Sequence, residues 1–219
     1  MSPRSAFDKE LKELQQDILR MASLVEQAVY NSVQSLLKLD VTGAAQVIMG
    51  DEMIDELCLE IENKCIILIA TQQPIARDLR IVITGIKILI ILERMADHAV
   101  DIARSAMCLY DQILTVKPLE YIPEMASLTQ KMIKDGLDSY VHNDVEKARA
   151  MCALDDDVDY LFARIFRELT NCMVEDPKVV VQSVYILSVS RYLERIADHA
   201  TNIGEAVIYL VTGEHKELN

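Results

Sequence analysis

The sequence predicts an all-α protein, and three observations support that prediction. The 219 residues include only six glycines and five prolines, so long stretches lack the residues that most often end a helix. Apolar residues recur at intervals of three or four, which is the spacing of one face of an α-helix. No stretch shows the sustained alternation of a half-buried β-strand, and no Asn-Gly hairpin signal occurs.

The first half of the chain contains three predicted helices. An apolar stripe over Leu11–Leu36 predicts the first, and a shorter stripe over Ile54–Leu68 predicts the second. The third helix follows Pro74 and contains the most apolar run of the chain, which Lys87 interrupts and which is too short to span a bilayer. We expect these helices over residues 5–39, 42–71 and 75–112.

Three further helices are predicted in the second half. Pro118 and Pro123 separate the third helix from the fourth, and Pro177 begins the sixth, which ends near Gly213. We expect these helices over residues 121–142, 144–174 and 177–212. Long helices joined by short connections must pack antiparallel, so we expect an elongated molecule.

An internal repeat divides the chain into two similar halves. The segment at 92–102, LERMADHAVDI, returns at 193–203 as LERIADHATNI, with eight of the eleven positions identical. A weaker echo pairs an Asp-x-x-x-Asp of the second predicted helix with another in the fifth. We therefore predict two tandem three-helix bundles that arose by duplication, the first over residues 1–115 and the second over residues 116–219.

The repeated segments carry acidic residues spaced by four, and such residues lie on one face of a helix. Each repeated segment therefore carries a row of acidic residues along one helix face, here called a carboxylate ladder. If the preceding helix of the same half packs alongside, its own acidic pair can join that ladder. The candidate metal ligands of the first half are Asp51, Asp55, Glu93, Asp97 and Asp101, and those of the second are Asp155, Asp159, Glu194, Asp198 and Asn202.

Carboxylates gathered in this way need compensating positive charge, because two like charges 4 Å apart repel by about 4 kcal/mol at an effective dielectric near 20. Arg94 and Arg195 project about 100° away from the ladders and are poor partners. Oxygen ligands suit Mg²⁺, Mn²⁺, Ca²⁺ or ferric iron, and bridging carboxylates favour more than one ion per site. The alternative is a solvated acidic face without metal. We expect His98 and His199 to be packing or supporting residues.

Charge and cysteine content limit the class of protein. The chain has 35 acidic and 22 basic residues, a net charge of −13, so no nucleic-acid partner is expected. The five cysteines are odd in number and form no C-x-x-C pair, which indicates reduced thiols and a cytoplasmic protein. We expect no transmembrane segment, and a peripheral membrane contact stays open.

The motifs of common catalytic sites are absent. The sequence has no phosphate-binding loop, nucleophile elbow or H-E-x-x-H motif, and the repeat contains Asp-His rather than the His-Asp of metal phosphohydrolases. We therefore expect a protein that is not an enzyme. A carboxylate-bridged metal hydrolase is the alternative from the enzyme class.

Several motifs resemble the PhoU family of phosphate-transport regulators. They are LERMADH at 92–98, its twin at 193–203, QPIARDLR at 73–80 and YLVTG at 209–213. The resemblance covers nearly the whole chain and implies two three-helix bundles. It also implies that the acidic motifs bind multinuclear metal clusters, with iron the expected metal and magnesium, manganese or zinc the alternatives. Asn202 replaces an acid, which argues against equal metal loading of the two halves.

The same resemblance implies a regulatory role. The protein would be a cytoplasmic negative regulator of phosphate uptake and phosphate-starvation signalling, and a homodimer. It would act as an adaptor between the phosphate ABC transporter and a sensor histidine kinase, peripheral to the inner membrane. A metal-free helical adaptor is the alternative.

Overall fold

The computed structural model describes residues 3–214, and its side chains are described from residue 7 onward. Within this range the chain forms α-helices and two short 3₁₀ helices, with no strand, which confirms the all-α prediction. The elements in chain order are α1 (Pro3–Lys38), α2 (Val41–Gln72), α3 (Arg77–Cys108), η1 (Lys117–Tyr121), α4 (Ile122–His142), α5 (Val145–Cys152), α6 (Asp155–Glu175), η2 (Pro177–Val179) and α7 (Val180–Thr212).

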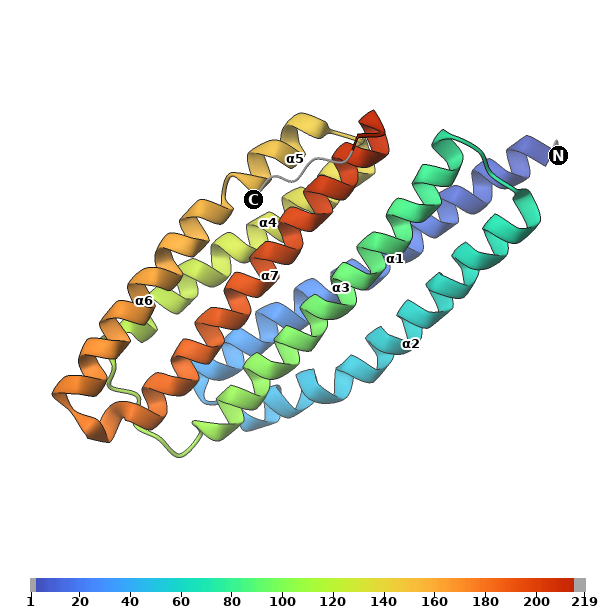
Figure 1. Cartoon of the computed structure of the whole chain (residues 1–219). Coiled ribbons are helices and arrows are strands. Elements are labelled where there is room, and N and C mark those ends of the chain that lie inside the picture. The colour runs from blue at the N-terminus through green and yellow to red at the C-terminus, as the bar shows by residue number, and fades with distance from the viewer. Residues whose placement is uncertain (1–2, 215–219) are drawn as a thin grey trace.

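The helices form two bundles that lie side by side in an elongated molecule (Figure 1). α1, α2 and α3 make the first bundle, and α4, α5, α6 and α7 make the second. The bundles meet where α3 packs along α7 and, less extensively, where α1 packs against α4. α3 and α7 run in opposite directions along their contact (Figure 1), so the repeated segments of the two halves face each other.

The predicted apolar stripes form the core. In α1 the side chains of Leu14, Ile18 and Met21 are completely buried. In α2 all five members of the predicted stripe, Ile54, Leu57, Ile61, Cys65 and Leu68, are buried, and Ala44 and Val47 extend the buried face toward the start of the helix. Burying a side chain of this size contributes about 1.5–3 kcal/mol, so the two stripes fix which face of each helix turns inward.

The single helix predicted over 144–174 is wrong, because the structure divides it into α5 and α6. The chain turns at Ala153 and Leu154, where the Leu154 N–H donates to the carbonyl of Met151 rather than to a residue four positions earlier. Three consecutive aspartates, 155–157, then occupy the first turn of α6. Carboxylates are stabilised at a helix N-terminus by the helix dipole, so this sequence favours a new start over a continuous helix. Together α5 and α6 take the place of one helix in the bundle (Figure 1).

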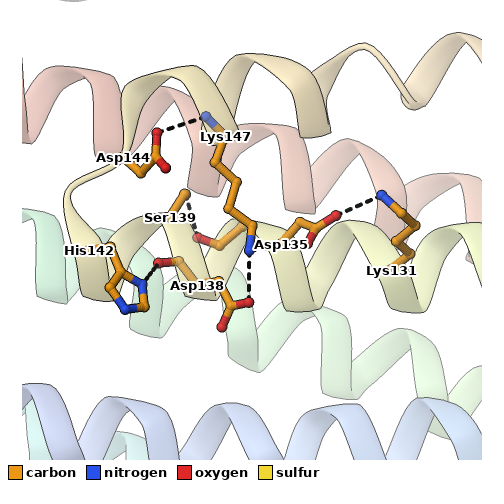
Figure 2. A network of polar contacts seen from close by, with 8 residues as sticks. Lys131, Asp135, Asp138, Ser139, His142, Asp144 and Lys147 are labelled. Atoms are coloured by element: carbon orange, nitrogen blue, oxygen red, sulfur yellow. Dashed lines mark hydrogen bonds and ion pairs between the residues drawn. The ribbon is translucent and has the colours of Figure 1, made fainter.

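A polar network holds the beginning of α5 against α4 (Figure 2). Asp144 caps α5 by accepting a hydrogen bond from the Lys147 N–H at 3.0 Å. The Lys147 ammonium reaches across to Asp138 at 2.8 Å and to Asp135 at 3.4 Å, both on α4. Asp135 also pairs with Lys131 at 2.7 Å. The short helix α5, which leads directly into the acidic residues of α6, is therefore anchored by charge as well as by its apolar face.

None of the helices in residues 3–214 contains an apolar stretch long enough to cross a membrane.

Candidate metal centres

The first acidic cluster lies between α2 and α3. Asp51 and Asp55 are one turn apart on α2, and Glu93, Asp97 and Asp101 follow one another on α3. Burial raises the pKa of the Asp51 carboxyl, and the carboxylates of Asp55 and Asp97 raise it further. Burial also raises the pKa of Glu93, with added contributions from Asp97 and Asp55. The carboxylates of α2 and α3 therefore interact across the two helices.

The second cluster lies between α6 and α7. Burial, followed by the charges of Asp198 and Asp159, raises the pKa of Asp155 to about 7. Burial is also the largest cause of the raised pKa values of Glu194 and Asp198, and a neighbouring carboxylate adds to each. Asn202, one turn further along α7, is exposed to solvent. Four carboxylates thus gather in this half, and the amide lies at the edge of the group.

Two buried oxygens of the second cluster accept no hydrogen bond from any residue in the described range. They are Oδ1 of Asp155 and Oε2 of Glu194. An unpaired buried polar atom costs about 1–3 kcal/mol, and more when it carries charge. A hollow of about 510 Å³ opens beside these residues and is lined by Arg149, Cys152, Ala153, Asp155, Asp156, Asp159 and Asp198. Within the described residues, two oxygens of the second cluster therefore lack a donor that would compensate their burial.

Arginines pair with one end of each ladder. Arg104 donates from Nη1 to Asp101 Oδ1 at 3.2 Å, and Arg191 donates from Nη1 to Glu194 Oε1 at 3.2 Å. Both pairs have i,i+3 spacing on a single helix. Arg94 and Arg195, the arginines predicted to be poor partners, are exposed, and each exerts a lowering effect on the pKa of the adjacent glutamate that burial outweighs. Each pair neutralises one carboxylate and leaves the rest of its cluster negative.

The donor set of each cluster fits a hard cation, since it consists of carboxylate oxygens. The unpaired oxygens of Asp155 and Glu194 are free to become ligands. As the side chains stand, however, no three Asp, Glu, His or Cys groups within residues 3–214 are arranged to hold a metal ion. Binding would require rotamer changes that bring the carboxylates of facing helices together, and metal binding stays a prediction.

The two repeated histidines lie where the bundles meet. The rings of His98 and His199 stack with centroids 5.6 Å apart, and Tyr192 stacks on His98 at 5.8 Å. Burial lowers the pKa of His98, and burial together with the neighbouring His98 lowers that of His199 to about 4. Both rings are therefore neutral near pH 7 and serve in packing. Nδ1 of His98 has no hydrogen-bond partner among the described residues.

Sequence reasoning missed several residues of these sites. Arg104 and Arg191 are visible as i,i+3 partners of predicted ligands, so their spacing could have identified them. Asp156 lines the hollow and directly follows a predicted ligand. Arg149 and Cys152 line it from α5, and no sequence signal marks them, because their position depends on the turn at 153–154.

The fold and these sites define a class of protein: a duplicated all-α protein with one acidic cluster in each bundle. A PhoU domain model matches the chain twice, over residues 18–106 and 122–207, one match in each bundle. The chain belongs to the PhoU family.

Relatives that align with nearly the whole chain support this assignment. The chain is 45% identical over 220 residues to a protein of Clostridium acetobutylicum named phosphate-specific transport system accessory protein PhoU homolog, covering 99% of both. The crystal structure of PhoU from Pseudomonas aeruginosa is similar with a TM-score of 0.92 and 36% identity, over 95% of this chain and 100% of that one. A PhoU described as a phosphate transport system regulatory protein from Streptococcus pneumoniae has a TM-score of 0.90 and 30% identity, over 97% and 100%. These relatives are named as accessory or regulatory proteins, not as enzymes.

Proposed function

We propose that the protein is a metal-binding negative regulator of phosphate uptake and of phosphate-starvation signalling. It acts in the cytoplasm at the inner face of the membrane as an adaptor between the phosphate ABC transporter and a sensor histidine kinase, and it works as a homodimer. The observation that carries the regulatory role is the 45% identity, over 99% of both chains, to a protein named as an accessory protein of phosphate-specific transport.

A gene deletion tests the regulatory role. In the host grown with abundant phosphate, removing the gene should raise the expression of phosphate-starvation genes, and the wild-type gene supplied in trans should restore repression. Repression that persists in the deletion strain would contradict a negative regulator. Repression that is lost only when the kinase gene is intact would support the adaptor role.

The metal proposal rests on the unpaired oxygens of Asp155 and Glu194 and on the uncompensated charge around them. An ion held there would neutralise the cluster and draw α6 and α7 together. A ligand present at 100 times its Kd stabilises the folded state by about 2.7 kcal/mol. Iron, Mn²⁺ or Mg²⁺ should therefore raise Tm, and EDTA should reverse the rise.

Matched variants separate metal binding from general charge relief. Glu194→Gln with Asp198→Asn should abolish the metal-dependent rise in Tm and the metal content measured by elemental analysis. Glu146→Gln with Glu175→Gln alters two exposed acids outside both clusters and should leave both readouts unchanged. A metal-free protein whose Tm ignores every cation would favour the helical adaptor without metal. Turnover of phosphate esters by metal-loaded protein would favour the hydrolase alternative.

A further inference from the structure

The outer surface of α2 exposes large apolar side chains. Met49, Met53, Leu59 and Ile66 are 77%, 50%, 59% and 54% exposed, and Ile90 on the adjacent α3 is 46% exposed. The opposite face of α2 is buried in the first bundle. A helix that is apolar on both faces is normally covered on both, and an exposed apolar patch with a polar rim is typical of an interaction site.

A groove of about 330 Å³ gives this surface a definite shape. It lies between α2 and α3 and is lined by Asp55, Cys58, Leu59, Ile90 and Glu93. Ile66 lies seven residues after Leu59, so it continues the same stripe two turns further along α2. The stripe and groove together match the spacing of the apolar anchors on one face of an amphipathic helix.

The charged residues of α2 are almost all acidic. α2 carries six acidic residues and one basic residue, Lys64. The Lys64 ammonium is already paired with Asp17 of α1 at 2.6 Å. Glu52, Glu56 and Glu62 are exposed on the turns beside Leu59, and none belongs to the proposed metal ligands. The apolar stripe is therefore bordered by carboxylates that no residue of α2 can neutralise.

We propose that this face of α2 binds a basic amphipathic helix of a partner protein. Large apolar side chains of that helix pack against Leu59 and Ile66. Its lysines or arginines pair with the glutamates that border the stripe, Glu52, Glu56 and Glu62. A second copy of this chain is a poor occupant, because it brings a net charge of −13 to an acidic surface. An anionic lipid surface is repelled for the same reason. The inference goes beyond the proposed regulatory role, and the glutamates that it assigns to charge pairing are not among the candidate metal ligands.

The corresponding groove of the second half differs in charge and so provides an internal control. It is lined by Phe162, Phe166, Leu187, Ser188, Arg191 and Tyr192. The Arg191 guanidinium lies over the Phe162 ring, 5.4 Å from its centroid. A basic helix would meet this arginine directly, so only the groove of the first half has the required complementarity.

Peptide binding to the full-length protein tests the proposal. The probe is a fluorescent helical peptide of about 18 residues, five turns long, with leucines on one face and lysines on the other. It should bind wild-type protein in fluorescence anisotropy, and Leu59→Ser with Ile66→Ser should weaken its Kd by about tenfold or more. Glu52→Lys with Glu56→Lys should weaken it as much and reduce its dependence on salt. Phe166→Ser, in the control groove, should leave the Kd unchanged.

Two peptide controls distinguish a specific groove from general attraction to an acidic protein. A scrambled peptide of the same composition lacks the apolar face, and a peptide with glutamates in place of lysines lacks the positive charge. Both should bind at least about tenfold more weakly. Equal binding of the scrambled peptide, or an unchanged Kd in the α2 variants with a native circular dichroism spectrum, would overturn the proposal.

The other possible occupants give distinct results. If wild-type protein is a dimer in sedimentation equilibrium and Leu59→Ser with Ile66→Ser is a monomer, a second copy covers the face and the proposal fails. If the protein cosediments with phosphatidylglycerol vesicles and the same variant does not, a lipid surface is the occupant and the proposal fails equally.

Discussion

The Asp155 carboxyl group lies where burial and neighbouring carboxylates both disfavour its charged form. The residue begins α6, has a buried oxygen without a hydrogen bond, and faces the acids of α7. Burial and those neighbours raise its pKa from an ordinary 3.8 to about 7. The folded metal-free protein therefore holds a proton on this group in a pH range where the unfolded chain has lost it.

This proton makes stability depend on pH. Because the folded-state pKa of Asp155 is the higher one, its stabilising protonation is complete at low pH and is lost as pH rises through about 7. In metal-free protein, Asp155→Asn should stabilise the fold above pH 7 by on the order of 1 kcal/mol, with screening allowed for, and the gain should vanish near pH 4. Urea unfolding across this pH range measures it.

Asp157→Asn is the matched control, since Asp157 lies in the same turn but is exposed. It should show no comparable gain at high pH. If the gain from Asp155→Asn is the same at all pH values, protonation of this group is not its source.

Gly204 is a second residue with a measurable cost of replacement. A Cβ there would lie 2.6 Å from Cys152 Sγ and 3.0 Å from Met151 Cε, so glycine allows α5 to pack directly on α7. Gly204→Ala should lower the free energy of unfolding by about 1–3 kcal/mol. Gly50→Ala, inside α2 with nothing within 4 Å of the new Cβ, should raise it by about 0.5–1 kcal/mol. Chemical denaturation of both variants checks the contrast.

At the scale of elements, the separation of α5 from α6 is the main departure from the sequence prediction. Apolar periodicity continues through 144–174, so it does not reveal the turn at Ala153 and Leu154. The run of aspartates at 155–157 does indicate a helix start, but the repeat pattern draws attention only to Asp155, as a candidate metal ligand. The two 3₁₀ helices are also absent from the sequence prediction, which treats Pro118 as a separator of helices and Pro177 as the start of the sixth helix.

The polar network of Figure 2 predicts how α5 depends on α4. Hydrogen bonds to Asp138 and Asp135 raise the pKa of Lys147 and keep it charged. Lys147→Met retains the aliphatic stem and removes the charge, so it should lower Tm modestly, and the loss should shrink at high salt. Lys9→Met removes a more exposed lysine, paired within α1, and should change Tm less. Equal effects of the two variants at all salt concentrations would contradict an anchoring role.

At the scale of the whole molecule, the contact of α3 with α7 joins the bundles. α3 packs against α7 about as extensively as it packs against α1 and α2 within its own bundle. The buried side chains of both helices, including Leu92, Met95, Leu193 and Ile196, belong to one continuous core. The two repeats are thus separate in sequence and joined in packing.

A shared core predicts cooperative unfolding. Thermal unfolding should show one transition, with the calorimetric enthalpy equal to the van't Hoff enthalpy, rather than one transition for each half. Met95→Lys, which places a charge in the contact region, should destabilise both halves together in hydrogen exchange. Two resolved transitions in the wild type would show that the halves fold independently.

The sequence was sufficient for the architecture and only partly so for the sites. Helical periodicity and the LER-x-ADH repeat predicted the two bundles. Both signals depend on the spacing of residues along the sequence, and this spacing does not depend on how the helices pack. The repeat also placed facing carboxylates on neighbouring helices correctly. The hollow beside Asp155 and the stacking of His98 on His199 depend on a backbone turn and on how the bundles meet, and neither leaves a periodic trace.

The duplication allows equivalent residues of the two halves to be compared within one protein. Glu93 and Glu194 descend from one position of the repeat, yet one lies beside an unbroken helix and the other beside a helix that restarts at Asp155. Substituting each in turn compares equivalent positions of the two halves in one fold, under the same conditions. A difference between the effects of the two substitutions measures how far the two halves have diverged since the duplication.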